Sequence, residues 1–321
     1  MDNKIYDVVI VGAGISGISA ARLLHSKGYN VLLLDKGRGI GGRMATRRVN
    51  VDGDDVYYDY GVQSFSVKLT PVKDILHSTK IDRSMTLWPY EKTINCLYIR
   101  GGNRLMPKIL AKDLKILKAA KVESINYYHD WETVTETGDT YHSRHVIITA
   151  PAPQSLELIN SGNAQLSNSQ LFKLDSITYT TNLVILIRLN DRVDLTTYKP
   201  ESDIIEIVVN NEDKGIKQKF QTLTVIFKSG YSSKFYNKPE IEHLWNFLEE
   251  VKEIRRENVA EYNVHRWKYS QPENYIEREA FIKGKSGIYL CGDYFFGNNC
   301  SNVELAIYSG LEAANDIIKN F

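Results

Sequence analysis

Residues 6–48 read YDVVIVGAGISGISAARLLHSKGYNVLLLDKGRGIGGRMATRR, a pattern that predicts a strand, a glycine turn, a helix, a second strand and a second glycine turn. Residues 6–11 are apolar, largely β-branched and without alternation, which is typical of a strand buried on both faces of a parallel sheet. A helix is expected over residues 15–27, with Gly28 placed to end it in the left-handed conformation. The stretch therefore predicts a β-α-β unit that cradles a dinucleotide.

The first glycine turn has the GxGxxG spacing of dinucleotide-binding sites. Gly12 permits the tight turn, Gly14 lets the backbone approach a pyrophosphate, and Gly17 lets the helix press against the strand. The helix N-terminus directs free N–H groups and a partial positive charge at the phosphates, so Ala13 and Ser16 are candidate contacts as well. A β-α-β unit without a ligand is the alternative.

Asp35 ends the second strand, 23 residues after Gly12, where a carboxylate can accept both hydroxyls of an adenosine ribose. A second glycine pair, Gly41 and Gly42, follows, and a simple NAD domain does not need it. Basic residues surround this pair: Lys36, Arg38, Arg43, Arg47 and Arg48. We expect the second turn to bring these cations to the same pyrophosphate, which favours FAD over NAD; a solvated charged face is the alternative.

The chain here resembles the flavin-containing amine oxidase superfamily, and residues 35–48, DKGRGIGGRMATRR, most resemble its renalase branch. The resemblance implies that Lys36, Gly42 and Arg43 help to bind FAD. It also implies that the FAD is non-covalent, because no cysteine matches the flavin-linking position of the superfamily.

The resemblance assigns further residues along the chain to the cofactor. In VYYDYGVQSF, residues 56–65, it places Asp59, Gly61 and Gln63 along the flavin ring, although an edge strand with a glycine bulge has the same pattern. Val122, which opens a β-rich meander, matches the valine that pairs with adenine, and an ordinary core valine is the alternative.

The C-terminal segment carries the second strong signal. A short apolar strand ends at Gly292 and Asp293, and a helix is expected from about Val303, with Ser301 and Glu304 spaced as a capping box. The resemblance places Asp293 beside the ribityl chain and the pyrophosphate. It places the helix N-terminus at the pyrimidine edge of the flavin, where the helix dipole offsets the negative charge of the reduced ring.

The middle of the chain predicts a substrate lobe. Between residues 155 and 237, strand-like runs separated by polar turns such as NNEDKG, residues 210–215, imply an antiparallel sheet. A helix is expected from about Pro239, with Arg255 and Arg256 in its last turn. Its apolar face comprises Ile241, Leu244, Leu248 and Val251.

Residues 264–272, VHRWKYSQP, form a predicted strand that returns to the cofactor. Trp267 and Tyr269 are two positions apart and share one face of it, so they are candidates for the walls of a substrate pocket for a flat ring. Gln63 is the third candidate for this pocket. Ordinary aromatic packing is the alternative.

These observations predict an α/β fold with two lobes. A Rossmann-like FAD-binding domain with a parallel sheet that is discontinuous in sequence is expected over residues 1–66, 98–152 and 280–321. A second, α+β substrate domain with a mainly antiparallel sheet is expected over residues 67–97 and 153–279.

The composition of the chain excludes several classes of partner and site. The 321 residues are 43% hydrophobic with a formal net charge of +1, so the chain is globular and no nucleic-acid partner is expected. The cysteines Cys96, Cys291 and Cys300 form no CxxC pair, which argues against a zinc site, a dithiol centre or a disulfide framework and favours a cytoplasmic location. No apolar run approaches the roughly 18–20 residues that span a bilayer, so no membrane partner is expected.

The resemblance implies a renalase-like FAD oxidase. Such an enzyme oxidises dihydro-NAD(P) isomers by hydride transfer to flavin N5, and dioxygen reoxidises the flavin to give hydrogen peroxide. The expected partners are thus a reduced nicotinamide nucleotide and dioxygen, and this chemistry requires no catalytic acid or base. A flavin amine oxidase, a carotenoid-desaturase-like oxidoreductase and a nucleotide-binding sensor without turnover are the alternatives.

Overall fold

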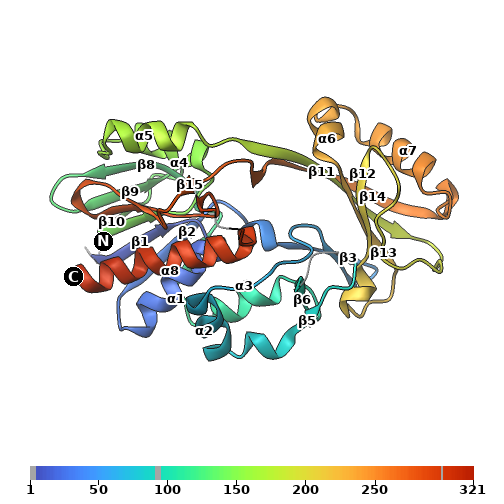
Figure 1. Cartoon of the computed structure of the whole chain (residues 1–321), viewed down its shortest axis with the longest axis horizontal. Coiled ribbons are helices and arrows are strands. Elements are labelled where there is room, and N and C mark those ends of the chain that lie inside the picture. Colours follow the sequence, from blue (N-terminus) through green and yellow to red (C-terminus); the bar gives the residue numbers. More distant parts are fainter. Residues whose placement is uncertain (1–4, 91–94, 298) are drawn as a thin grey trace.

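The chain forms two lobes joined by long strands, as Figure 1 shows for a computed structural model that describes residues 5–90, 95–297 and 299–321. Residues 1–4, in the predicted cofactor lobe, and residues 91–94, in the predicted excursion 67–97, lie outside the described residues. Among the residues described, no helix combines the length and the apolar character needed to cross a membrane.

The first lobe is built on a sheet with the strand order β16-β17-β10-β1-β2-β7. Its strands span Ile282–Lys283, Ile288–Leu290, Thr140–Ile148, Tyr6–Val11, Val31–Asp35 and Ile116–Lys118, in that order. β17, β10, β1, β2 and β7 are parallel to one another, and β16 is antiparallel to β17. Strands from both ends and from the middle of the chain thus lie together, which confirms the predicted discontinuous parallel sheet.

Strand β1 is apolar on both faces of the sheet, and helices cover one of these faces. Val8 and Ile10 pack into the cluster that contains α1 (Ile15–Ser26) and α8 (Asn302–Asn320), and these two helices lie side by side. Gly28 has a φ of +87°, as expected for the residue that ends α1. The first turns of α1 and α8 therefore both belong to one layer of the cofactor lobe.

The opposite face is covered by a meander and two helices. β8 (Val122–Tyr127) and β9 (Trp131–Thr135) pack there with α4 (Ala152–Asn160) and α5 (Asn168–Asp175). The division into lobes remains a prediction, and this packing favours one change to it. Because α4 and α5 share a hydrophobic cluster with β1, we would move the boundary at residue 153 to about residue 178.

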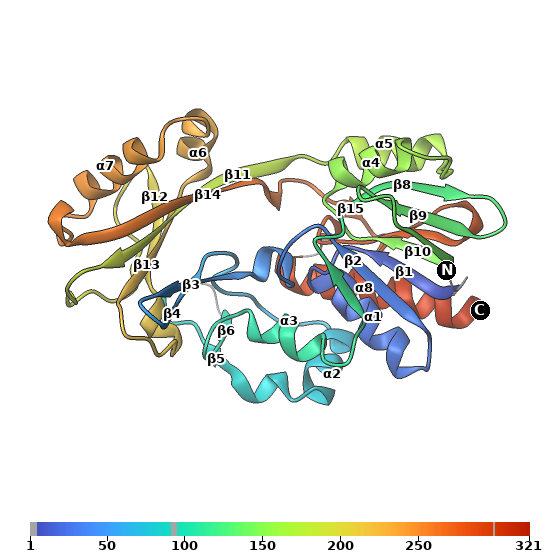
Figure 2. The same ribbon diagram turned by 180° about the vertical axis from the view of Figure 1, so that it is seen from behind.

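The second lobe is an antiparallel sheet of order β12-β13-β11-β14, which confirms the predicted strand arrangement. The strands span Ile205–Asn210, Thr222–Phe227, Tyr179–Leu189 and Val259–Pro272. α6 (Ser229–Phe235) and α7 (Glu240–Glu250) cover its outer face. The long β11 and β14 run from this sheet to the cofactor lobe, as Figure 2 shows from behind.

The helix expected from Pro239 ends earlier than predicted. α7 stops at Glu250, since Val251 has φ −112° and ψ 86°, and Arg255 and Arg256 lie beyond the helix. Ile241, which was expected on the buried face, is 36% exposed. The chain leaves the helix early and buries Ile254 against the sheet.

Shorter elements complete the two lobes and the region between them. They are β3 (Thr46–Val51), β4 (Asp54–Asp59), α2 (Thr70–Ser78), β5 (Met85–Leu87), β6 (Leu97–Ile99), α3 (Leu105–Leu110), β15 (Ile276–Glu277), β18 (Phe295–Phe296) and the 3₁₀ turns η1 (Gly42–Met44), η2 (Ile81–Ser84), η3 (Asn211–Lys214), η4 (Arg256–Asn258) and η5 (Lys285–Gly287). The β3–β4 hairpin packs on the inner face of the second sheet. Its end therefore lies where the two lobes meet.

The contact between α1 and α8 gives a first testable prediction. A Cβ on Gly310 of α8 would lie 2.3 Å from the backbone oxygen of Ser16, whereas a Cβ on Gly230 of α6 meets no atom within 4 Å. Gly310→Ala should therefore lower the free energy of unfolding by about 1–3 kcal/mol through overpacking. Gly230→Ala should leave it unchanged or raise it by up to about 1 kcal/mol, because alanine is the better helix former. Urea denaturation of both variants checks this, and equal effects would contradict the observed helix contact.

Candidate active site

A cavity of about 1540 Å³ lies between the lobes. It exceeds the roughly 300–1,000 Å³ of a site for one small molecule, so it has room for a dinucleotide and a second ligand. The predicted site residues that line it are Gly12, Gly14, Ser16, Asp35, Lys36, Gly42, Arg43, Gly61, Gln63, Val122, Trp267, Tyr269, Gly292, Asp293 and Val303. Among the other predicted residues, Ala13, Gly17 and Asp59 do not line it.

The first glycine turn has little space for side chains. At Gly12, where φ is +108°, a Cβ would lie 2.4 Å from the Thr149 hydroxyl oxygen; at Gly17 it would lie 2.2 Å from the Gly12 carbonyl oxygen. Gly14 is the N-cap of α1, and no side chain caps this helix. The first N–H groups of α1 are therefore available to an anion.

The space beside Gly14 shows whether the turn can accommodate a dinucleotide. Its φ is −72°, which any residue adopts, and a Cβ placed on it meets no protein atom within 4 Å. Neither the backbone conformation nor the packing of the protein therefore requires glycine here. The open space borders the cavity at the start of α1, where the GxGxxG pattern expects a pyrophosphate.

Asp35 is fixed against the first turn at the end of β2. Its Oδ2 accepts a hydrogen bond of 2.6 Å from the Ala13 N–H, and its Oδ1 accepts one of 2.6 Å from the Gly37 N–H. Each carboxylate oxygen has a second lone pair, so Asp35 can still accept from ribose hydroxyls in the cavity that it lines.

The second glycine turn lies directly against the first. The Gly41 N–H donates to the Ala13 carbonyl at 2.8 Å, and Gly14 forms a β-bridge with Gly41. The basic residues of this region that line the cavity are Lys36, Arg38 and Arg43.

Two of the expected cations are directed elsewhere. Arg47 lies on β3 and donates to the Asn263 side chain, and Arg48, on the same strand, pairs with Asp55 at 2.6 Å. The expectation that all five basic residues surround the pyrophosphate was therefore wrong for these two. They belong to a β-hairpin whose start the sequence pattern did not reveal.

The two ends of the chain meet at Arg43. Its Nη2 forms a 2.7 Å ion pair with Oδ1 of Asp293, and its Nη1 donates to the Ser270 carbonyl at 3.0 Å. The Arg43 carbonyl in turn accepts from the Val62 N–H at 2.9 Å, and a Cβ on Gly61 would lie 1.9 Å from that oxygen. The close approach at Gly61 thus holds the segment 59–63 against the N-terminal turn.

The N-terminus of α8 also borders the cavity, through Val303. Ser301 caps the helix by accepting from the Glu304 N–H at 3.3 Å, but the predicted reciprocal bond is missing. Oε1 of Glu304 instead accepts from the backbone N–H groups of Lys68 and Leu69. The capping box is therefore half formed, because the carboxylate holds the chain before α2.

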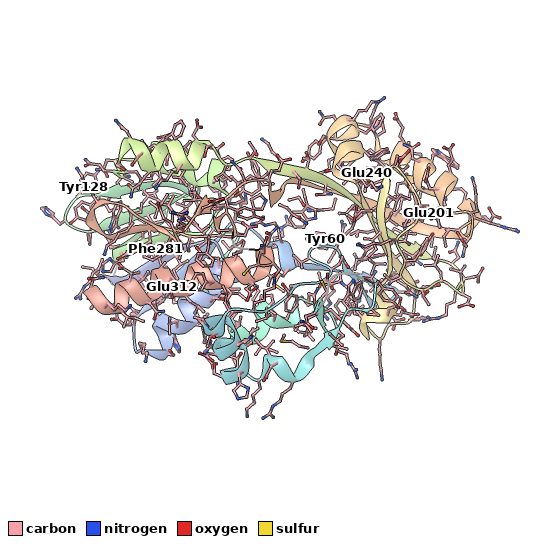
Figure 3. All side chains as sticks on the ribbon, in the orientation of Figure 1. Tyr60, Tyr128, Glu201, Glu240, Phe281 and Glu312 are labelled. Carbon is pink, nitrogen blue, oxygen red and sulfur yellow. The ribbon has the colours of Figure 1, made fainter. Side chains whose placement is uncertain are left out.

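Aromatic rings line the cavity beneath the second lobe, and Trp267 and Tyr269 are among them. Trp267 stacks on Tyr60 with ring centroids 5.5 Å apart and 17° between the planes. Tyr269 packs edge-on against Tyr179 at 5.5 Å. Figure 3 labels Tyr60 where the two lobes meet.

A buried lysine holds the neighbouring segment 59–63 in place, and nothing in the sequence pattern marked this lysine as a site residue. Lys214, in the predicted polar turn NNEDKG, is fully buried, and its ammonium lies 2.8 Å from Oδ2 of Asp59 and 2.6 Å from Oε1 of Gln63. Burial lowers the pKa of Lys214, and Asp59 offsets part of this shift. Asp59 is 1% exposed and does not line the cavity, so its expected place along the flavin ring was wrong.

His265 was also missed, although a signal was present. It lies two positions before Trp267 on β14 and lines the cavity. The alternation that selected Trp267 and Tyr269 could have found it.

The cysteines are not poised for thiolate chemistry. Burial raises the pKa of the Cys291 thiol to about 12, and burial with the nearby Glu304 raises that of Cys300, which lines the cavity, to about 11. Asp130, Glu132 and His142 place their ligand atoms within 4.8 Å of one another on the meander. No second feature of that surface points to a metal ion.

Comparisons with known proteins identify related sequences. A family model described as "NAD(P)-binding Rossmann-like domain" matches residues 10–78, and one described as "Flavin containing amine oxidoreductase" matches residues 84–318. Among curated proteins, amine oxidase [flavin-containing] A of Sus scrofa is 37% identical over 99 residues, which are 30% of this chain and 17% of the relative. Renalase of Mus musculus is 28% identical over 196 residues, which are 56% of each chain. These matches thus span about one sixth and just over half of the relatives' lengths.

Solved structures have the same fold at low identity. Cyclohexylamine oxidase from Brevibacterium oxydans superposes with a TM-score of 0.70 at 13% identity, covering 99% of both chains. Putrescine oxidase bound to putrescine gives a TM-score of 0.71 at 13% identity, covering 98% of this chain and 99% of the other. The two-lobed α/β architecture is therefore the one found in these oxidases.

Proposed function

The chain belongs to the flavin-containing amine oxidoreductase family, and on that premise we propose that it is an FAD-dependent oxidase of reduced nicotinamide nucleotides. FAD is the cofactor, and its binding is non-covalent. The open approach at Gly14 and the carboxylate of Asp35 suit its adenosine diphosphate half. The pair of Arg43 and Asp293 lies farther along the same cavity.

When bound, FAD supplies the hydride acceptor and passes the electron pair to dioxygen, which yields hydrogen peroxide. The protein binds the cofactor and orients the substrate. The first N–H groups of α1 and the side chains of Lys36 and Arg38 hold the phosphates, while Asp35 accepts from the ribose. Segment 59–63, fixed by Lys214, forms a rigid wall at the substrate end. No side chain needs to exchange a proton in this account.

The charged residues at the substrate end of the cavity are the reason for proposing this substrate. From the second lobe, Lys199, Lys228, Arg266, Lys268 and Glu206 are the charged residues that line the cavity. Lys199 pairs with Glu206, and Arg266 lies 3.5 Å from Glu240, whereas Lys228 and Lys268 pair with no carboxylate among the described residues. This excess of positive charge attracts the phosphates of a dinucleotide and repels a protonated amine.

Anaerobic mixing with candidate reductants tests the proposal and is our second prediction. Dihydro-NAD(P) isomers reduced at the wrong ring carbon should bleach the flavin absorbance faster than ordinary NADH, and faster than cyclohexylamine, putrescine or aromatic amines at equal concentration. On admission of air, hydrogen peroxide should appear in an amount equal to the substrate consumed. Rapid bleaching by amines alone would overturn the nicotinamide assignment and leave an amine oxidase.

Two simpler observations distinguish the proposed enzyme from a sensor and non-covalent from covalent flavin binding. A purified protein without flavin absorbance, and unable to take up FAD, would favour a nucleotide-binding sensor. Flavin that stays with the polypeptide after acid precipitation would contradict non-covalent binding. We also propose a cytoplasmic location, because a reducing compartment suits the three free cysteines.

A further inference from the structure

His265 has a defined place in the substrate end of the cavity. Its ring packs edge-on against Tyr60, with centroids 4.7 Å apart, and against Trp267, with centroids 4.3 Å apart. Tyr60 and Trp267 stack on each other, and all three rings line the cavity. On the neighbouring strand β11, the apolar Val184 lies opposite His265. The imidazole is therefore held at a fixed angle by an aromatic wall.

The polar atoms of this ring are open to a ligand. Within the described part of the chain, neither ring nitrogen of His265 has a hydrogen-bond partner, and its ring packs against those of Tyr60 and Trp267. Neither nitrogen is among the fully buried polar atoms that lack a partner, so each keeps some accessible surface. By contrast, Nδ1 of His243 bonds to the Tyr231 hydroxyl at 3.0 Å in the protein core.

The charge state of His265 follows from its surroundings. Burial and, to a smaller extent, the positive charges of Arg47 and Arg266 together lower its pKa to about 4. The remaining groups packed on it, Tyr60, Trp267 and Val184, carry no charge at neutral pH. The imidazole is thus neutral near pH 7, with one nitrogen that donates and one that accepts.

We propose that His265 is a specificity residue that hydrogen-bonds the carboxamide of a ring stacked along the wall of Tyr60 and Trp267. A carboxamide offers one acceptor oxygen and a donor NH₂ group, which match the two kinds of nitrogen in a neutral imidazole. The inference rests on the proposed function, because a dihydronicotinamide is a ring of this kind.

The test compares His265→Phe, which keeps an aromatic ring, with His265→Gln, which keeps a donor and an acceptor. Binding of oxidised NAD to the oxidised holoenzyme is followed by calorimetry, and flavin reduction by dihydro-NAD isomers is followed anaerobically. We expect His265→Phe to raise the dissociation constant of NAD roughly tenfold, as for a lost hydrogen bond, and His265→Gln to stay within about threefold of the original. His129→Phe, on the exposed meander, is the control and should change neither value.

A second measurement separates hydrogen bonding from packing. The acetylpyridine analogue of NAD lacks the NH₂ group, so the preference of the original protein for NAD over this analogue should be lost in His265→Phe. The dissociation constant of NAD should also stay flat from about pH 8 to about pH 5. Unchanged binding and preference in His265→Phe, or a break in the profile near pH 6.5, would overturn the proposal.

These experiments distinguish a failure of the role proposed for His265 from a failure of the proposed function. If the original protein is reduced by dihydro-NAD isomers but His265→Phe behaves identically, the role of His265 alone is rejected. If the original protein neither binds NAD nor is reduced by any dihydronicotinamide, both are rejected. Thermal unfolding of each variant, with and without FAD, identifies a variant that fails to fold. His265→Gln then decides whether the ring nitrogens matter.

Discussion

Replacing Gly14 with alanine should weaken FAD binding about 5- to 150-fold while the free protein unfolds as before. No protein atom lies within 4 Å of the added methyl group, and the φ of −72° suits alanine, so the free protein has no reason to be destabilised. In the complex the methyl group occupies the approach to the pyrophosphate. Forcing such an overpacked contact costs about 1–3 kcal/mol, which is the stated loss of affinity.

Gly17→Ala is the matched comparison, because it lies in the same turn and differs in what surrounds it. Its added Cβ would lie 2.2 Å from the Gly12 carbonyl oxygen, so this variant should be destabilised with or without FAD. Fluorescence titration of the apoprotein with FAD and thermal unfolding of both variants separate the two effects. A Gly14→Ala protein with unchanged affinity would mean that the pyrophosphate lies elsewhere.

Lys214→Met should lower the free energy of unfolding by about 3–5 kcal/mol. Lys214 is fully buried, and its ammonium is bonded to the carboxylate of Asp59, which is 1% exposed. Removing the lysine leaves a carboxylate in the protein interior without its counter-charge, and the hydroxyl of Thr46 and the Asn103 N–H cannot replace that charge. Urea denaturation with an unchanged slope would measure the loss.

Two further variants make this prediction specific. Lys219→Met removes a lysine of the same segment that pairs with Asp54 at 2.8 Å in solvent, and it should leave the unfolding free energy nearly unchanged. Adding Asp59→Asn to Lys214→Met should recover part of the loss, because the unpaired charge is then absent. If all three variants unfold alike, the buried pair contributes no more to stability than the exposed pair does.

The sequence predicts the cofactor end of this molecule well because its determinants are local. The spacing of Gly12, Gly14 and Gly17 and the position of Asp35 follow from two strands and the turn and helix between them. The parallel sheet and the antiparallel second sheet follow from apolar runs and turn residues that a short window contains. Such signals need no knowledge of distant partners.

Several residues that were missed or mispredicted have environments that depend on distant parts of the chain. Lys214 belongs to a polar turn by composition, yet it is buried by Asp59 and Gln63, 155 and 151 positions away. Glu304 bonds to the N–H of Leu69, 235 positions away, instead of closing its capping box. His265 is different, since the two-residue period of its strand already placed it beside Trp267.

The crystal structure of the protein with FAD tests the central claim most directly, because Asp35 and Asp293, from opposite ends of the chain, line one cavity. We predict one FAD molecule, with its adenosine ribose within hydrogen-bond distance of the Asp35 carboxylate. Its flavin half should lie beside Asp293, Gly61 and the N-terminus of α8. An FAD that reaches only one of the two aspartates, or that binds outside this cavity, would contradict the account.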